Sequence, residues 1–159
     1  MTTAYLSGPW RNLPHYNFQT FEDAKCWLTN SLGWEVISPH DYAINTGQAH
    51  IVARYDFVGE YPKRVFTSVK FTRGNHDKEW FQMFTTDIAK VDRFVLLPHW
   101  QISEGAVREA LVAIWMGLPF SQLMYKDERF SLCDVSVTEG TLAQILAANT
   151  KHQAVFRAS

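Results

Sequence analysis

The sequence is poor in cysteine, in excess charge of one sign and in long apolar runs, and each shortage excludes a class of protein. Its two cysteines, Cys26 and Cys133, show no CxxC or metal-ligand spacing, which indicates a reducing, cytoplasmic setting. A net charge of −1 supplies no positive field for binding the phosphates of a nucleic-acid polymer. No stretch approaches the roughly 20 apolar residues of a membrane span, and residues 1–6 do not resemble a secretion signal. We therefore expect a cytoplasmic protein with neither a nucleic-acid polymer nor a membrane as its partner.

Several catalytic and cofactor motifs are missing as well. No GxxxxGK[ST] or GxGxxG follows a predicted strand, which excludes a P-loop kinase and an ordinary dehydrogenase. The six histidines form no HExxH or similar cluster, so no metal site is expected. The segment around Ser7 is not a GxSxG elbow, which argues against a serine hydrolase. The sequence therefore predicts neither a metal nor another cofactor.

What the sequence does contain is enough apolar material, 47% of 159 residues, for the core of a single domain over residues 1–159. Apolar runs predict strands at 3–7, 34–38, 93–97 and 121–125. Helical periodicity predicts helices at 18–32, 80–89, 104–116 and 138–148. This alternation predicts an α/β fold of Rossmann-like or flavodoxin-like type, an open, mostly parallel sheet with helices on both faces.

The segment from about 42 to 78 interrupts this alternation. Aromatic and β-branched runs at 55–61 and 64–71 flank Pro62 and Lys63, which predicts an inserted hairpin or a long loop turning at that dipeptide. Insertions of this size often form lids or interfaces. The excursion is therefore a candidate contact surface.

Candidate binding residues follow the predicted strands, because ligands in open α/β sheets bind beyond the carboxyl ends of the strands. The first strand is followed by a polar loop, the second by a His-Asp pair, and the third by a loop that opens a helix. Three loops are thus expected to converge on one pocket. The candidates in chain order are Ser7, Gly8, Arg11, Asn17, His40, Asp41, Trp100, Ser103 and Gly105.

Glu109 is the candidate catalytic carboxylate. Ser103 is a suitable N-cap for its helix, and Gly105 lets a ligand approach the backbone. Glu109 then lies in the second turn among apolar neighbours, where an ionised carboxylate is a competent nucleophile. A solvent-facing glutamate beside an i,i+4 pair of Glu104 and Arg108 is the alternative.

Asp87 is the second candidate carboxylate, near the end of the preceding helix. It is preferred over Asp92, which lies at the start of a strand and so at the opposite edge of the sheet. Near Glu109, Asp87 would hold a sugar hydroxyl or donate a proton if its pKa is raised. An exposed helix charge is the alternative.

Together these residues resemble a known family. YLSGP at 5–9, Asp87 ahead of RFVLLP, and Ser103-x-Gly105-x-x-x-Glu109 resemble the nucleoside 2-deoxyribosyltransferase-like superfamily, which includes nucleotide N-glycoside hydrolases. YNF at 16–18, LPHWQ at 97–101 and GLP at 117–119 are most similar to its small phage-associated branch. The resemblance covers about residues 3–125 except the excursion.

The resemblance implies a mechanism and roles. Glu109 would attack the anomeric carbon and release a base, and the glycosyl-enzyme would be resolved by water or by a second base. Tyr5 would orient Glu109, and Asp87 would assist protonation of the leaving base. Ser103 would contact the sugar or a 5′-phosphate, and serine at this place favours hydrolysis over transfer. Arg11 would favour a nucleotide over a nucleoside.

The resemblance also implies a homo-oligomer, to which the excursion at 42–78 would contribute contacts. Two other functions stay open from the sequence. One is a non-catalytic module that binds a nucleotide in the same pocket. The other is a structural protein that binds a partner through the aromatic excursion. Trp100 would stack on a nucleobase if it lines the pocket.

Overall fold

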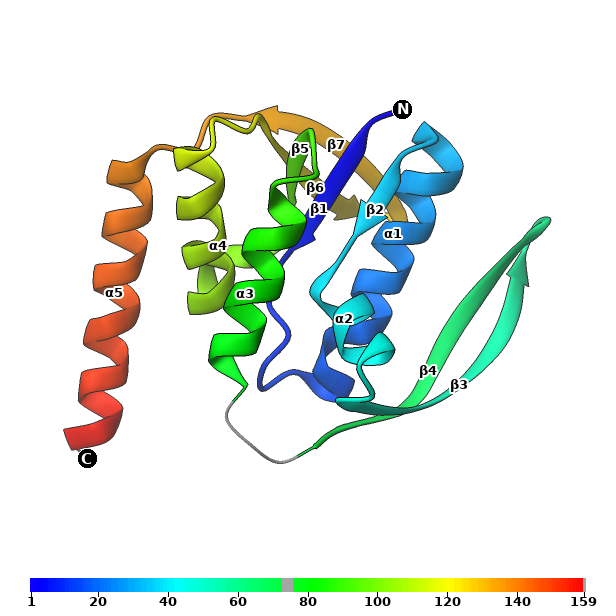
Figure 1. The fold of residues 1–159 in the computed structure, drawn as a ribbon, viewed down its shortest axis with the longest axis horizontal. Helices are drawn as coiled ribbons and strands as arrows, with labels where there is room; N and C mark the ends of the chain where they lie inside the picture. Colours follow the sequence, from blue (N-terminus) through cyan, green and yellow to red (C-terminus); the bar gives the residue numbers. More distant parts are fainter. Residues whose placement is uncertain (73–75, 159) are drawn as a thin grey trace.

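A five-stranded sheet forms the centre of the computed structural model, which describes residues 1–72 and 76–158 (Figure 1). The strands lie in the order β2–β1–β5–β6–β7. Four of them run parallel, and β7 runs antiparallel to β6. The bounds are β1 Thr3–Ser7, β2 Glu35–Ile37, β5 Arg93–Leu96, β6 Phe120–Lys126 and β7 Arg129–Val135.

Helices cover both faces of this sheet. Because side chains alternate along a strand, Ala4 and Leu6 of β1 face α1 (Phe18–Leu32), whereas Tyr5 faces the opposite layer. That layer contains α3 (Asp77–Ile88), α4 (Glu104–Trp115) and α5 (Glu139–Ala158). The predicted Rossmann-like, flavodoxin-like architecture is therefore confirmed. Within the described ranges, no helix combines the length and the hydrophobicity needed to cross a membrane.

The strand order creates a switch point at β1. The chain runs from β1 through α1 to β2 on one side, and later returns to β5 on the other side of β1. At such a point the connections leave in opposite directions and open a crevice at the carboxyl ends of the strands. Ser7, the last residue of β1, lies at this crevice.

Two elements depart from the sequence prediction. A short helix, α2 (Pro39–Asn45), follows β2 where a loop was expected, and Pro39 starts this helix as well as ending the strand. β7 was also missed; it pairs with β6 across a turn in which Asp127 and Glu128 both have positive φ. Neither residue is glycine, so the turn lacked its usual sequence signal.

The excursion forms an antiparallel hairpin of β3 (Ala49–Val58) and β4 (Tyr61–Phe71). The expected turn at Pro62 and Lys63 is wrong: the strands reverse at Gly59 and Glu60, and Pro62 lies within β4. Gly59 has a φ of +65°, which glycine adopts without strain. The predicted helix bounds also shift, since α3 starts at Asp77 and α5 extends well beyond residue 148.

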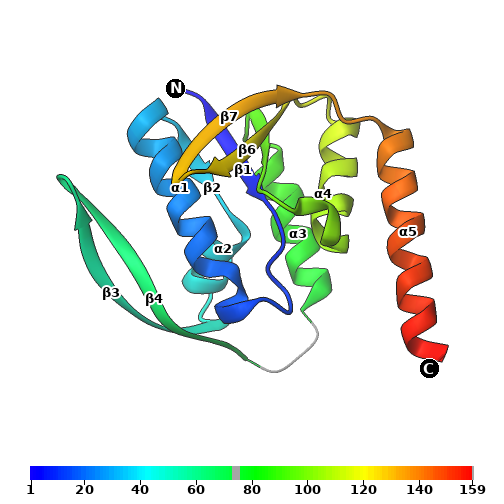
Figure 2. The same cartoon turned by 180° about the vertical axis from the view of Figure 1, so that it is seen from behind.

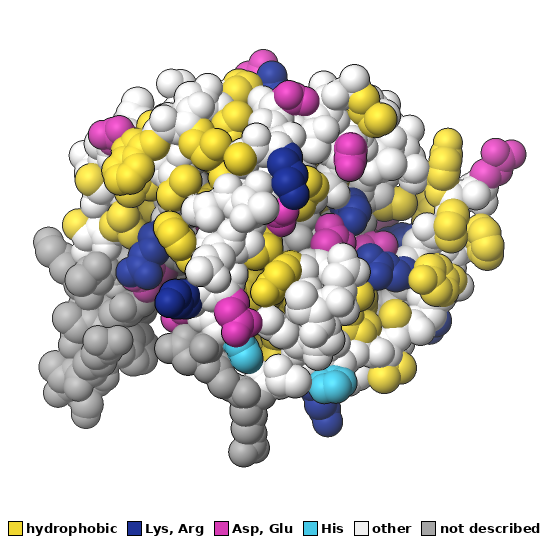
Figure 3. Space-filling model, in the orientation of Figure 1, with side chains coloured by type: hydrophobic (Ala, Val, Ile, Leu, Met, Phe, Trp, Pro, Cys, Tyr) yellow, Lys and Arg dark blue, Asp and Glu magenta, His cyan; other side chains and the backbone are white. Residues whose placement is uncertain are grey.

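The hairpin projects from the body, as two opposite views show (Figures 1 and 2). Its base joins a third core cluster in which Phe66 and Val69 of β4 pack against Phe18 of α1 and Ala43 of α2. Its outer part carries exposed apolar side chains, visible at the right of the space-filling view (Figure 3). The base is thus anchored, and the tip is not covered by the described residues.

Candidate functional site

Glu109 lies at the switch point of the sheet, beside the carboxyl end of β1. Tyr5 and Ser7 are two residues apart on β1, so both point to the same face, toward α4. The Tyr5 hydroxyl donates to Oε2 of Glu109 at 2.7 Å, and the Ser7 hydroxyl donates to Oε1 at 3.0 Å. Each carboxylate oxygen is therefore held by a different residue of the central strand.

The start of α4 sets the position of Glu109. Ser103 is the N-cap, and its hydroxyl oxygen accepts from the backbone N–H of Ala106 at 3.2 Å, as expected from the sequence. Ala106 and Ala110 are buried against the sheet, so Glu109 between them in the helical turn reaches β1. Small residues on this face let the helix approach closely enough for the carboxylate to meet two hydroxyls.

The electrostatics of this group suit chemistry near neutral pH. Burial raises the pKa of Glu109 to about 7, although the hydrogen bonds from Tyr5 and Ser7 lower it. Burial also raises the pKa of Tyr5 well above 10, and the charge of Glu109 raises it further. Tyr5 therefore stays a protonated donor, and Glu109 exchanges its proton close to pH 7.

A cavity of about 730 Å³ opens between α2 and α3 on the same face of the sheet. It is lined by Ile37, the register partner of Tyr5, and by Asp87, Gln82 and Thr86 of α3. The volume is that of a small-molecule site. Glu109 is not among its lining residues, and since Ile37 pairs with Tyr5, the cavity lies one strand away from the carboxylate.

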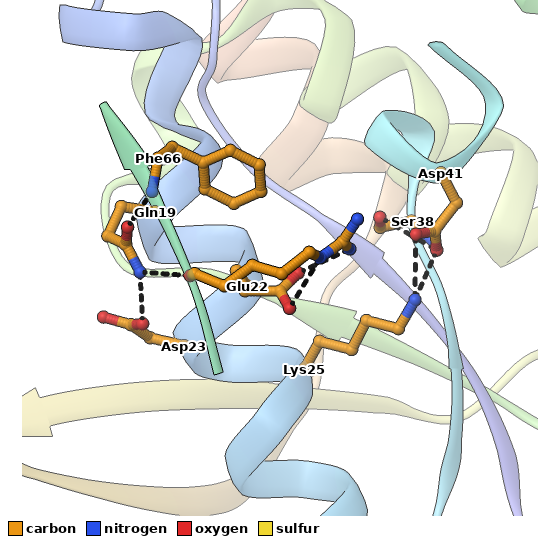
Figure 4. Close-up of polar contacts among 8 residues, drawn as sticks. Gln19, Glu22, Asp23, Lys25, Ser38, Asp41 and Phe66 are labelled. Carbon is orange, nitrogen blue, oxygen red and sulfur yellow. Dashed lines mark hydrogen bonds and ion pairs between the residues drawn. The ribbon is translucent and has the colours of Figure 1, made fainter. Parts of the chain in front are cut away.

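Most of the charged residues that line this cavity are acidic. Asp41, Glu79 and Asp87 line it together with one cation, Lys25. The Lys25 ammonium is already 2.8 Å from both oxygens of Asp41, whose Oδ2 also accepts from the Ser38 N–H at 3.1 Å (Figure 4). A negatively charged ligand would thus meet carboxylates without a free cation among the lining residues.

Asp87 is the carboxylate of α3 that lines the cavity, and its environment weakens its acidity. Burial raises the pKa of Asp87, Lys90 at 3.8 Å lowers it, and the charge of Asp41 raises it again. The charges of Asp87 and Asp41 also raise the pKa of Tyr5. Asp87 is therefore electrostatically coupled to Tyr5, although no hydrogen bond joins Asp87 to Tyr5 or Glu109 in the described part of the chain.

The loop after β1 holds three predicted binding residues, and the structure gives each a contact within the protein. Asn17 donates from Nδ2 to the backbone oxygen of Pro9 at 2.7 Å. Arg11 is mostly exposed and pairs with Asp77 at 2.8 Å. Gly8 is buried, and a Cβ atom at this position would lie 2.6 Å from Cβ of Leu97. Close packing against Leu97 accounts for this glycine without a ligand.

Replacing Gly8 by alanine is expected to lower the free energy of unfolding by about 1–3 kcal/mol, because the added methyl overpacks the contact with Leu97. Urea denaturation measures this loss. Gly105→Ala is the matched control: a Cβ there meets only Ser103 Oγ at 3.9 Å, and alanine favours the helix. Equal stability of both variants would contradict the packing explanation.

His40 and Trp100 were expected at the pocket, but both are core residues. His40 is 3% exposed, stacks on Phe18 with ring centroids 3.8 Å apart, and contacts Phe21 edge-on. Burial lowers the pKa of His40 to about 3. Trp100 is 4% exposed within the cluster that contains Tyr5. Both side chains are almost fully buried, His40 in the first turn of α2 and Trp100 in the turn after β5, so neither is accessible to a ligand.

Sequence reasoning missed several cavity residues. Lys25 looked like an ordinary polar position of α1, and Gln82 and Thr86 like the solvent face of α3. Ser38 carried a readable signal, because S-P-H-D has the spacing of a capped helix start, whereas Asp41 was among the predicted binding residues and lines the cavity. No group of three or more metal-ligating side chains occurs among the residues that the structure describes.

Comparison with known families adds one match. The model of a family described as a domain of unknown function, DUF4406, matches residues 2–122. The match spans β1 to the start of β6 and includes Tyr5, Asp87 and Glu109, whereas β7 and α5 lie beyond it. No curated protein matches the chain. The candidate site therefore lies entirely within the matched part of the chain.

Proposed function

The chain belongs to the DUF4406 family, and we propose that it cleaves the N-glycosidic bond of a deoxynucleoside or deoxynucleotide, or exchanges its base, through Glu109. One observation carries this proposal: the Glu109 carboxylate is held on both oxygens by Tyr5 and Ser7 at the carboxyl end of β1. The resemblance to the nucleoside 2-deoxyribosyltransferase-like superfamily supports it, because two of its motif residues, Tyr5 and Glu109, are hydrogen-bonded to each other.

The proposed reaction has two steps. In the first, a Glu109 oxygen bonds to the anomeric carbon, and the C–N bond breaks with its electron pair leaving on the base. The base takes a proton, for which Asp87 is the candidate donor because its pKa is raised. In the second, water or another base attacks the same carbon, gives a proton to the Asp87 carboxylate, and frees Glu109 as a carboxylate. Tyr5 and Ser7 hold Glu109 in place through both steps.

The cavity favours a deoxynucleoside within this substrate class. The three lining carboxylates, on Asp41, Glu79 and Asp87, repel a 5′-phosphate, and Lys25 is already paired. Arg11, the expected phosphate ligand, is itself paired with Asp77. An uncharged sugar would instead donate its hydroxyls to these carboxylates.

The proposal also concerns partners and location. A small nucleoside or nucleotide and a further copy of the chain are the proposed partners. The reducing cytoplasm is the proposed location, because the structure leaves both Cys26 and Cys133 as free thiols.

A chromatographic screen tests the function directly. Purified protein is incubated with deoxynucleosides and with their monophosphates, and free base is quantified. Release of base supports the proposal. A preference for deoxynucleosides over their monophosphates supports the inference that the cavity carboxylates repel a 5′-phosphate. Recovery of intact, stoichiometrically bound ligand favours the non-catalytic module, an alternative supported by the placement of Glu109 outside the cavity lining.

Replacing Ser7 by alanine is expected to move the pH dependence of base release rather than to abolish it. In the wild-type protein the hydrogen bond from Ser7 lowers the pKa of Glu109. Its loss raises that pKa, so the acid limb of kcat/KM shifts to higher pH. The rate above the limb falls by about tenfold, the effect of one hydrogen bond to a charged group. Ser121→Ala, another fully buried serine of the sheet, is the matched control. An acid limb that stays in place would contradict a positioning role for Ser7.

A further inference from the structure

The outer edge of β3 is an open β-strand edge. Among the described residues β3 pairs only with β4. The other edge of β4 is occupied near α1, where the Gln19 amide accepts from Phe66 N–H at 2.9 Å and donates to the Arg64 carbonyl at 3.3 Å (Figure 4). Open edges are normally blunted by lysine or proline. β4 carries both, as Pro62, Lys63 and Lys70, whereas β3 carries neither.

The residues along this edge are complementary to themselves. In an antiparallel pairing about a twofold axis at Tyr55, Arg54 of one copy lies opposite Asp56 of the other, and the reverse pair forms on the far side of the axis. Ala53 then meets Phe57. The pairing of β3 with β4 shows no register shift from Ala53 to Val58, so this stretch has the regular backbone that a new strand pair needs.

The same stretch exposes unusual apolar area. Phe57 is 72% exposed and Tyr55 is 66% exposed, and Val58 and Tyr61 beside them are at least half-exposed. With aromatic side chains burying about 150–250 Å² each when fully covered, such a contact buries roughly 500 Å² per copy. The total of about 1,000 Å² is at the lower end of specific interfaces, so the association should depend on concentration.

We propose that two copies of the chain join through β3, antiparallel and edge to edge, about a twofold axis at Tyr55. The two hairpins then form one four-stranded ribbon, and the main-chain groups of the open edge bond to each other. Phe57 of each copy lies beside Ala53 of the other, and the two Tyr55 residues meet at the axis. Arg54 and Asp56 exchange their pairing within one chain, at 3.4 Å, for pairing across the axis. This interface does not depend on the proposed reaction.

A charge-swap series tests the register by sedimentation over a range of concentrations. Arg54→Asp or Asp56→Arg alone places like charges opposite each other twice, once on each side of the axis, and is expected to weaken dimerisation at least about tenfold. The double variant, Arg54→Asp with Asp56→Arg, restores the opposite charges and the dimer. Dimers that tolerate each single change would overturn the proposal, as would a double variant weaker than both singles.

Crosslinking tests the axis itself. Opposed residues of antiparallel strands have Cα atoms about 4.5–5.5 Å apart, within the range of a disulfide. In a chain with the exposed thiol removed by Cys133→Ser, Tyr55→Cys is expected to give a disulfide-linked dimer under mild oxidation. Val52→Cys is the matched control, because its two copies would lie about 20 Å apart. Equal crosslinking of both variants, or a wild-type monomer at about 100 μM, would overturn the proposal and leave the edge for a strand of another protein.

Discussion

Glu109→Gln is expected to abolish release of base, lowering the rate at least about 1,000-fold, while making the protein more stable at pH 8. The amide lacks the nucleophilic charge but keeps the shape and still hydrogen-bonds to Tyr5 and Ser7. The rate loss is measured by chromatography of released base. The stability gain is measured by urea denaturation of the same preparation.

The gain in stability follows from the direction of the pKa shift. The pKa of Glu109 rises from 4.5 to about 7 on folding, so the folded chain holds a proton that the unfolded chain has released. The contribution to stability is therefore complete below pH 4.5 and lost as pH rises through 7. Glutamine does not titrate, and Glu109→Gln should gain about 1–3 kcal/mol at pH 8. The gain disappears as pH falls toward 4.5.

A neighbouring glutamate provides the control. Glu104 is on the same helix and forms an i,i+4 pair with Arg108 at its surface. Glu104→Gln should leave both the rate and the pH dependence of stability unchanged. If Glu109→Gln retained wild-type turnover, the nucleophile proposal would be wrong, whatever the stability data showed.

The pH profile of kcat/KM is expected to be bell-shaped, because Glu109 must be ionised to attack and Asp87 must be protonated to donate its proton to the base. Of the two ionisations, the one assigned to Glu109 lies near pH 7. Initial rates across a series of buffers of equal ionic strength measure both limbs. Each buffer is checked for retained fold by circular dichroism.

Asp87→Asn separates the two carboxylates in this profile. The amide does not titrate, so the profile of this variant should follow Glu109 alone, rising to about pH 7 and then levelling off, at a lower rate because protonation of the base is slower. If the ionisation near pH 7 disappeared in Asp87→Asn, it would belong to Asp87, and its assignment to Glu109 would be wrong.

Much of the architecture could be predicted because its signals are local. The apolar run at β1 and the period of α1 both ended at glycines where the structure ends them, Gly8 and Gly33. The candidate nucleophile Glu109 could also be predicted, because a capped helix with small residues on one face brings its second turn to the sheet. The hydrogen bond from Ser7 to Glu109 could not be predicted, because it joins residues 102 positions apart and no local pattern links them.

The remaining differences come from tertiary contacts. The turn of the hairpin was placed at Pro62 because proline usually ends strands, yet an edge position near the tip tolerates it. His40 looked like a pocket residue from its place after a strand, but three aromatic rings enclose it. Lys25 lines the cavity only because α2 brings Asp41 over α1. Packing between helices decides such positions, and no local pattern encodes it.

The span between β1 and α4 has a consequence for biosynthesis. Tyr5 and Ser7 are made first, but their partner Glu109 follows 104 and 102 residues later. During translation the central strand leaves the ribosome with one lateral neighbour, β2, and must wait for β5 and α4 before its hydroxyls find the carboxylate. A nascent or truncated chain that stops short of α4 can contain a folded first half and still have no reactive centre. Enzymatic turnover would therefore report completed folding of the chain, rather than merely the presence of its amino-terminal half.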